Sequence, residues 1–194
     1  MAYIPKILAF AGSTRRASHN KRVVQIAAAG ARDAGVEVTF LDLKDLPMPI
    51  YDADAQEAEG FHPNAAEFQR ILLAHDGLIV STPEYNGSLP GVLKNAFDWA
   101  SRANGDIKMG ATFRGKVAAI MAASPGGFGG IQCLSHLRDV LSVMGVIVLP
   151  EQFAVPTVHT AINETGVFAD EKMQNLISRH GANAAEMIKK IKSL

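Results

Sequence analysis

Short runs of apolar residues alternate along this chain with longer segments in which apolar residues recur every three or four positions. A short apolar run bounded by turn residues is typical of a strand, and a run that is apolar on both faces is typical of a parallel sheet. Five such runs predict strands at Lys6–Ala11, Val36–Leu41, Gly77–Ser81, Lys116–Ala123 and Val146–Leu149.

The segments between these runs have the periodicity of amphipathic helices. Helices are predicted over Lys21–Ala34, which Gly35 closes, over Ala65–Ala74 and over Glu171–Ile191. Two more are marked by apolar residues that share one helical face, at Leu89, Val92, Leu93, Ala96, Phe97 and Ala100, and at Leu134, Leu137, Val140, Leu141 and Met144.

Strands and helices that alternate in this way join into right-handed crossovers and a parallel sheet covered on both faces. We therefore predict an α/β fold, a three-layer sandwich with a five-stranded parallel sheet in the order 2-1-3-4-5. Residues 1–194 are expected to form a single domain, because this length suits one substantial core. In that order strands one, three and four are neighbours, and their carboxyl ends form the ligand crevice.

Composition narrows the function classes. Lys and Arg number 19, and so do Asp and Glu, so no global field draws the chain to nucleic acid or to an anionic membrane. No apolar run approaches the length of a membrane span, and the default expectation is a cytoplasmic protein. The only cysteine, Cys133, excludes an intrachain disulfide, and its helical pattern favours a small buried residue over a reactive thiol.

The loop that follows the first predicted strand, Gly12–Asn20, offers hydroxyls, an amide, two guanidinium groups and the N–H groups of a helix start. These are the groups that bind a phosphate. The loop is neither a dinucleotide-binding GxGxxG motif nor a Walker A motif. The alternative is a polar connector in which Ser18 caps the next helix.

The loops after the third and fourth strands also have unusual compositions. Thr82–Ser88 contains Asn-Gly, which commonly marks a hairpin, but a helix follows at Leu89, so we do not predict one. As a tight turn at the carboxyl edge of the sheet, the segment can present its Glu, Tyr and Asn to a planar ligand. Ser124–Gly130 carries four glycines, which let backbone approach a flat ligand; the alternative is a simple flexible connector.

Other candidate sites are weaker. Asp52, Asp54, Glu57 and Glu59 form a carboxylate cluster without the glycine of a calcium loop, so a solvated face is the better interpretation. No metal site and no catalytic triad are predicted.

The three loops closely resemble those of the NADPH-dependent FMN reductase family, flavodoxin-like proteins that include quinone, chromate and azo reductases. The family's phosphate loop is matched by Gly12, Ser13, Arg15, Ser18 and Asn20. Its second motif is matched by Pro83–Asn86 followed by Pro90–Trp99, and its third by Ser124–Gly127 with Gly129 and Gly130, then His136–Arg138. Close relatives often carry Arg-x-Gln-Tyr where this chain has Gln132–Ser135, so no subunit contact is carried over to these positions.

The resemblance implies FMN as cofactor and NADPH or NADH as co-substrate. Ser13, Arg15, Ser18 and Asn20 would hold the phosphate of FMN. His19 lies in the same loop, where a surface position and a place in the cofactor-binding set are both open. The isoalloxazine ring would be lined by Pro83, Glu84, Tyr85, Asn86 and Gly87, with Ser124, Pro125, Gly126 and Gly127 on the other side of its polar edge.

The implied function is an oxidoreductase that passes electrons from NAD(P)H through FMN to quinones, azo compounds, metal oxyanions or free flavin. No catalytic side chain is expected, because the flavin carries the hydride chemistry. The alternative is a flavodoxin-type electron carrier, but such carriers have uncharged phosphate loops and acidic surfaces, unlike Arg15, Arg16 and a net charge of zero. A flavin-free binding module would require all three loops to be coincidental.

The resemblance also implies a homodimer, or a homotetramer, with flavin sites near a subunit interface. Arg102 follows the helix that contains Trp99. Arg102 lies near the rim of the crevice if that helix ends about there, or on the opposite rim if the helix is a full crossover. From there it could still reach a partner's flavin and attract anionic NADPH or an oxyanion, or it could be a solvated surface residue.

Overall fold

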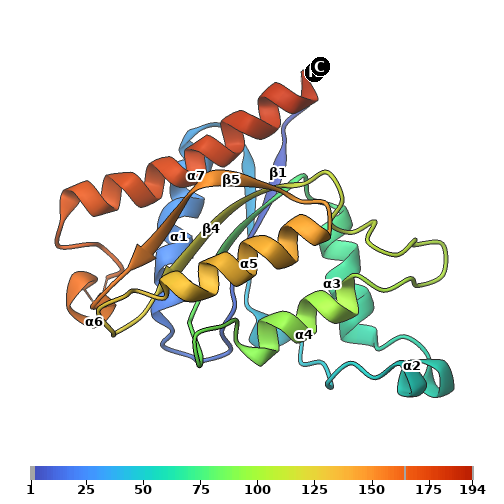
Figure 1. Ribbon diagram of the computed structural model, residues 1–194. Coiled ribbons are helices and arrows are strands. Elements are labelled where there is room, and N and C mark those ends of the chain that lie inside the picture. The colour runs from blue at the N-terminus through green and yellow to red at the C-terminus, as the bar shows by residue number, and fades with distance from the viewer. Residues whose placement is uncertain (1–2, 164, 194) are drawn as a thin grey trace.

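A parallel sheet in the order β2-β1-β3-β4-β5 lies between two layers of helices, as Figure 1 shows. The computed structural model describes residues 3–163 and 165–193. The strands are β1 (Lys6–Ala11), β2 (Glu37–Leu41), β3 (Gly77–Thr82), β4 (Val117–Ala123) and β5 (Ile147–Val155). The predicted fold class and strand order are confirmed.

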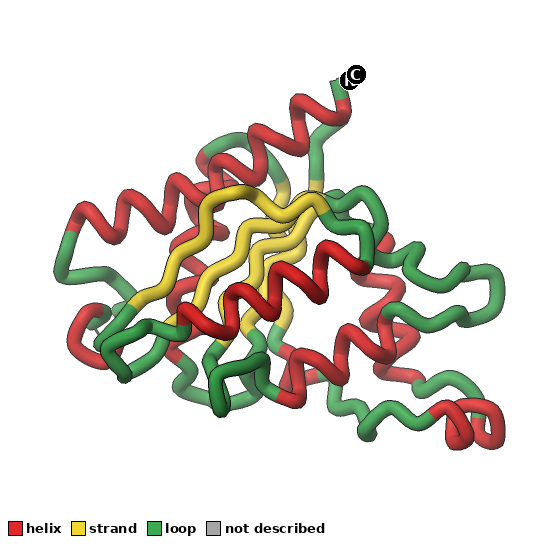
Figure 2. The backbone as a smooth tube through the Cα atoms, in the orientation of Figure 1, coloured by secondary structure: helices red, strands yellow, loops and turns green. Residues whose placement is uncertain are grey.

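The alternation of side chains along the strands divides the core in two. Ile7 and Ala9 of β1 pack on one face of the sheet, and Leu8 and Phe10 pack on the other. The first face is covered by α1 (His19–Asp33) and α7 (Glu171–Lys192). The second is covered by α3 (Pro63–Leu73), α4 (Gly91–Ala100) and α5 (Ile131–Val143), and Figure 2 shows both layers flanking the strands.

The fifth strand is longer than the pattern predicts, because the prediction stops at Pro150. The strand lies at the edge of the sheet, where proline is tolerated because one row of N–H groups has no partner strand. The pairing with β4 shifts there: Ala118 is opposite Val148, whereas Ile120 is opposite Gln152. Pro150 lies within this irregularity of the pairing, where a missing N–H group does not interrupt a regular ladder.

Two short helices were not predicted. In α2 (Ala53–Glu59) no residue is buried, so the helix has no apolar stripe to reveal it; Asp52 caps it by accepting from the N–H of Asp54. The cluster of carboxylates there is a solvated face, as interpreted. The other is α6 (Val158–Ala161), which has one buried residue and follows β5 directly. A 3-10 turn, Leu43–Asp45, follows β2.

The first and last helices pack with their backbones almost in contact. A Cβ atom added to Gly30 of α1 would lie 2.0 Å from the carbonyl oxygen of Ser178, and one added to Gly181 of α7 would lie 1.8 Å from that of Ala27. Glycine at these positions is therefore required by the close approach of two helices. Asp76 ties both ends of the described chain together, since it accepts from the Tyr3 hydroxyl (2.7 Å) and pairs with Lys192 (2.9 Å).

His180 is a buried ionisable residue on the inner face of α7. Its side chain is 1% exposed and packs edge-on against Phe153, with ring centroids 5.0 Å apart. Among the described residues neither ring nitrogen has a hydrogen-bond partner. Burial lowers the pKa of His180 to about 4, although the nearby backbone of Ile120 works against this. The histidine is therefore neutral in the folded protein near neutral pH.

We expect acid to destabilise the fold through His180. An unfolded histidine binds its proton near pH 6.5, whereas His180 in the folded state does so only near pH 4. Stability is thus lost as the pH falls from about 6.5 to about 4, by about 3 kcal/mol at most. Urea unfolding at pH 7.0, 5.5 and 4.5 should show this loss in the wild type and a much smaller one in His180→Leu. The exposed His159→Leu serves as control, and equal pH dependence in all three proteins would contradict the assignment.

Candidate functional site

The first loop begins with a close approach to β3. The N–H of Gly12 donates to the carbonyl of Ser81 at 2.9 Å, and a Cβ atom on Gly12 would lie 2.7 Å from Leu93. The loop ends at Ser18, which takes the N-cap position of α1 by its backbone but makes no side-chain cap bond. The buried hydroxyl of Ser18 therefore remains available to a ligand.

The three predicted loops meet at one cavity of about 110 Å³ at the carboxyl edge of the sheet. The cavity is lined by Ser13, Arg15, Ser18, His19, Asn20, Pro83, Glu84, Tyr85, Ala123, Ser124 and Pro125. Ten of these residues are predicted cofactor-binding residues, and Ala123 is new. Asn86, Gly87, Gly126 and Gly127 lie in the same loops but do not line the cavity. The cavity is much smaller than FMN, so it suits the phosphate end of that molecule.

Positive charge surrounds this cavity. The pKa of His19 is lowered by burial and then by the nearby charges of Arg22, Arg15 and His159. Its Nδ1 atom is buried and has no hydrogen-bond partner among the described residues. An anion in the cavity would offset the surrounding positive charge. The donors present therefore fit a phosphate group.

Asn20 connects the ends of two neighbouring strands. Its Oδ1 accepts from the Ser81 hydroxyl (2.7 Å) and from the N–H of Ala123 (2.9 Å), while its Nδ2 donates to the carbonyl of Ala123 (2.9 Å). The side chain is 3% exposed. One N–H of the amide remains for a ligand, so Asn20 acts chiefly as a clamp that fixes the carboxyl ends of β3 and β4.

The second loop contains a tight two-residue turn. Asn86 and Gly87 both have positive φ, 52° and 72°, and Tyr85 and Ser88 exchange two backbone hydrogen bonds of 3.0 and 3.1 Å. This is the turn that Asn-Gly favours in hairpins. Tyr85 and Ser88 form an isolated bridge outside the named strands, so the segment is a tight turn and not a hairpin of two strands. The Tyr85 side chain is left 56% exposed beside the cavity.

The third loop is supported by the segment after β5. The N–H of Thr157 donates to the carbonyl of Gly126 (3.2 Å), and that of Val158 donates to the carbonyl of Ser124 (3.1 Å). A Cβ atom on Gly129 would lie 2.7 Å from the backbone of Pro156, whereas one on Gly127 would meet nothing within 4 Å. The loop is therefore packed on one side and open at Gly127, where a flat ligand has room.

Arg102 lies away from these loops. Helix α4 runs as a full crossover, and Arg102 follows its last turn, outside the set of residues that line the cavity. Its Nε donates to the carbonyl of Asp98 (3.2 Å), and its guanidinium lies over the ring of Tyr51 at 5.5 Å. In its own subunit Arg102 is thus bound to local groups, and any role at a partner's flavin stays a prediction.

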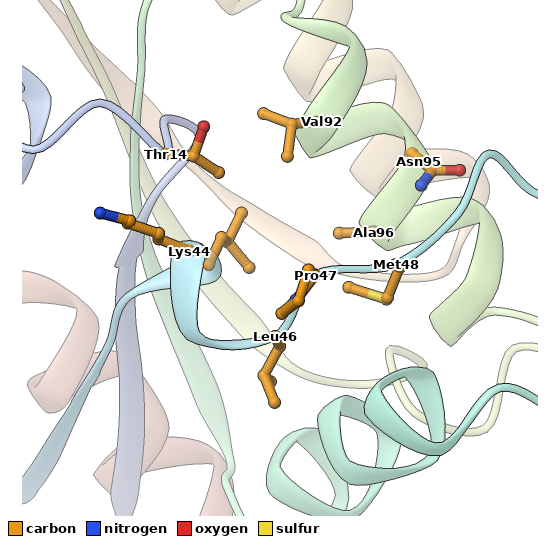
Figure 3. A pocket seen from close by; sticks show the side chains of 9 residues that line it. Thr14, Lys44, Leu46, Pro47, Met48, Val92, Asn95 and Ala96 are labelled. Atoms are coloured by element: carbon orange, nitrogen blue, oxygen red, sulfur yellow. The ribbon is translucent and has the colours of Figure 1, made fainter.

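A larger hollow of about 310 Å³ borders the first loop at Thr14 (Figure 3). Its other walls come from α4 and from the segment after β2, and the lining residues are Leu43, Lys44, Leu46, Pro47, Met48, Val92, Asn95 and Ala96. Asn95 is already bonded to the N–H of Tyr51 and the carbonyl of Pro49, both at 2.8 Å. The hollow is mostly apolar, and none of the predicted site residues lines it.

The structure adds two negative findings. No group of three or more His, Cys, Asp or Glu residues that could hold a metal ion occurs within residues 3–163 and 165–193. In the same part of the chain, no helix combines the length and the apolar character that crossing a membrane requires. Cys133 is fully buried, and burial raises the pKa of its thiol to about 12, which confirms the interpretation as an inert core residue.

Comparison with known proteins gives a consistent picture. The family model for NADPH-dependent FMN reductase matches residues 5–160. An NAD(P)H-dependent FMN reductase of Pseudomonas aeruginosa is 36% identical over 175 residues, 90% of each chain. A quinone reductase of Escherichia coli K12 is 31% identical over 190 residues, 96% of this chain and 97% of the relative.

Among solved structures, the flavoenzyme NAD(P)H:(acceptor) oxidoreductase of Paracoccus denitrificans superimposes with a TM-score of 0.80 at 26% identity, over 96% of this chain and 98% of that one. An archaeal flavodoxin superimposes with a TM-score of 0.63 at 13% identity, over 95% of this chain and 99% of that one, which shows the shared fold alone. The family match covers all three loops of the cavity. This chain therefore belongs to the NADPH-dependent FMN reductase family.

Proposed function

We propose that the cavity holds the phosphate of FMN and that the second and third loops flank its isoalloxazine ring, in an enzyme that transfers electrons from NAD(P)H to a quinone. One observation carries the assignment of the site. Three loops from separate strands converge on a cavity that is lined by the buried Ser13 and Ser18 and by Arg15. When bound, FMN supplies the hydride chemistry.

The side chains of the chain bind and orient the cofactor. The hydroxyls of Ser13 and Ser18 and the first N–H groups of α1 would donate to the phosphate, and Arg15 would offset its charge. The backbone of the Asn86–Gly87 turn would flank the ring on one side. On the other, the open backbone at Gly127 lets the ring approach without a side chain in the way.

Purified protein separates the three functional hypotheses. A flavin-binding protein should show an absorption band in the 450 nm region, and NADPH should bleach this band rapidly if the protein is a reductase. A bound flavin that NADPH does not reduce would instead favour an electron carrier. A protein that takes up no FMN when titrated would contradict the assignment of the cavity.

Arg15→Ala is expected to weaken FMN binding more than Arg16→Ala. Arg15 lines the cavity, whereas Arg16 does not. A charge-assisted hydrogen bond contributes about 1.5–3 kcal/mol, which corresponds to a loss of affinity of about 10- to 100-fold. Titration of FMN-free protein, followed by quenching of flavin fluorescence, measures both variants. Arg16→Ala is the matched control, and equal losses in the two would rule out the contact.

The acceptor is proposed to be a quinone. The name of a second relative, a 2-hydroxy-1,4-benzoquinone reductase of Burkholderia that is 38% identical over 150 residues, supports this class. Azo compounds, metal oxyanions and free flavin are the further acceptors to screen under steady-state turnover. We place this reaction in the cytoplasm, and the same assays would compare NADPH with NADH.

We also propose that the chain assembles into a homodimer, with a homotetramer as the further possibility. A groove of about 330 Å³ between α4 and α5 is lined by Phe97, Val140, Val143 and Met144, among others, and Val143 is 89% exposed. Exposed apolar surface of this kind is typical of an interface. Sedimentation velocity at micromolar concentration should show a dimer or larger, and Val143→Glu should shift it toward monomer. A wild-type monomer with full activity would refute the proposal.

A further inference from the structure

The helix after the third loop begins without a cap of its own. Gly130 takes the N-cap position of α5, and glycine has no side chain that could accept from the first N–H groups of the helix. Its φ of +87° favours glycine, and a Cβ atom there would lie 2.9 Å from Ala122 and 3.6 Å from the Cβ of Glu84. The amino end of α5 is therefore open toward the second loop.

Glu84 supplies the missing acceptor. Its Oε2 accepts from the N–H of Cys133 at 2.9 Å, across 49 positions of sequence. Cys133 is the third residue of α5, where N-cap side chains usually accept. A carboxylate is well suited to this place, because the amino end of a helix carries partial positive charge. One oxygen of Glu84 is thus used within the protein.

A second contact holds the far end of the same loop. The Oγ of Ser88 and the Nδ1 of His136 are 2.9 Å apart, one helical turn beyond Cys133. The Asn86–Gly87 turn lies between the two contacts. Gly87 packs against the side chain of Gln132: a Cβ atom added to Gly87 would lie 2.8 Å from the Oε1 atom of Gln132. The second loop is therefore attached to α5 on both sides of its turn.

We propose that Glu84 is a positioning residue, which anchors the second loop to the amino end of α5 and so fixes the backbone that this loop presents to the flavin. The proposal rests on the function proposed above. It changes the role expected for Glu84, from a side chain that lines the ring to one that acts through the main chain of Tyr85–Ser88. Because α5 also follows the third loop, the anchor sets the two flavin loops relative to each other.

The test uses the full chain with three variants. Glu84→Ala removes the acceptor, and Glu84→Gln keeps an acceptor oxygen without the charge. Glu57→Gln, on the exposed face of α2, is the matched control. In the FMN-free protein, hydrogen exchange of the Tyr85 and Ser88 amides should be about tenfold or more faster in Glu84→Ala, with the amides of α1 unchanged. FMN affinity should fall by about 10- to 100-fold in Glu84→Ala, and by no more than about threefold in Glu84→Gln and Glu57→Gln.

Three results would overturn the proposal. Wild-type FMN affinity in Glu84→Ala would show that the anchor is dispensable. Lower affinity with unchanged exchange, in Glu84→Ala alone or in both Glu84 variants, would show that Glu84 contacts the flavin directly. If Glu84→Ala does not fold, His136→Ala takes its place, and unchanged exchange at Ser88 then refutes the anchor. A wild-type protein that binds no FMN contradicts the proposed function, and the exchange results still decide the anchor.

Discussion

Replacing Asn20 with alanine is expected to lower the free energy of unfolding by about 3–5 kcal/mol, even in protein without FMN. The substitution removes three buried hydrogen bonds and leaves the N–H and carbonyl of Ala123 and the hydroxyl of Ser81 without their partner. Each buried polar group left unsatisfied costs about 1–3 kcal/mol, and the carboxyl ends of β3 and β4 lose their connection. FMN affinity should fall as well, because these strand ends carry the second and third loops.

Urea unfolding of the FMN-free protein measures the effect. Asn64→Ala is the matched control: its Nδ2 donates to the carbonyl of Pro47 at 2.7 Å, but at an exposed position, and a loss below about 1 kcal/mol is expected. If Asn20→Ala is as stable as the wild type and loses only FMN affinity, Asn20 is a ligand of the cofactor and not a clamp.

The second large effect is expected for Gly181→Ala. In most helices this change stabilises by about 1 kcal/mol, because alanine has the higher helix propensity. Here the new Cβ atom would lie 1.8 Å from the carbonyl oxygen of Ala27, so α1 and α7 must move apart. This overpacking against the backbone makes the substitution destabilising instead of stabilising. We expect the free energy of unfolding to fall by about 3 kcal/mol.

Thermal or urea unfolding measures the stability of Gly181→Ala, and Gly91→Ala is the matched control. Gly91 begins α4, and a Cβ atom there meets nothing within 4 Å, so its replacement should be neutral or slightly stabilising. A stable Gly181→Ala protein would mean that the two helices are not held as closely as described.

The sheet could be predicted because the sequence patterns that mark its strands and crossover helices each lie within one short segment. Each strand is a short apolar run, and each crossover helix has its own apolar stripe, so the order of elements fixes the topology. The exceptions have physical reasons. Helix α2 buries no residue and leaves no periodic signal, and β5 continues past Pro150 because only an edge strand tolerates proline there.

The sequence predicted most of the residues that line the site, but it did not predict the roles of two of them. The loop motifs name ten of the eleven residues that line the cavity. The roles of Asn20 and Glu84 depend on Ala123 and Cys133, 103 and 49 positions away, and no local pattern reports such partners. The Asn86–Gly87 turn was visible in the sequence, because Asn-Gly favours positive φ at both positions.

The close contact between α1 and α7 has a consequence for synthesis on the ribosome. A domain generally folds as a unit, and during synthesis its amino-terminal part emerges first. Here α1, whose amino end borders the cavity, presents its glycine face to a helix that emerges only after nearly the whole described chain. During translation that face stays exposed, and contacts between such distant segments form slowly. The glycine face of α1 is therefore among the last surfaces of the described chain to be packed, after α7 has left the exit tunnel.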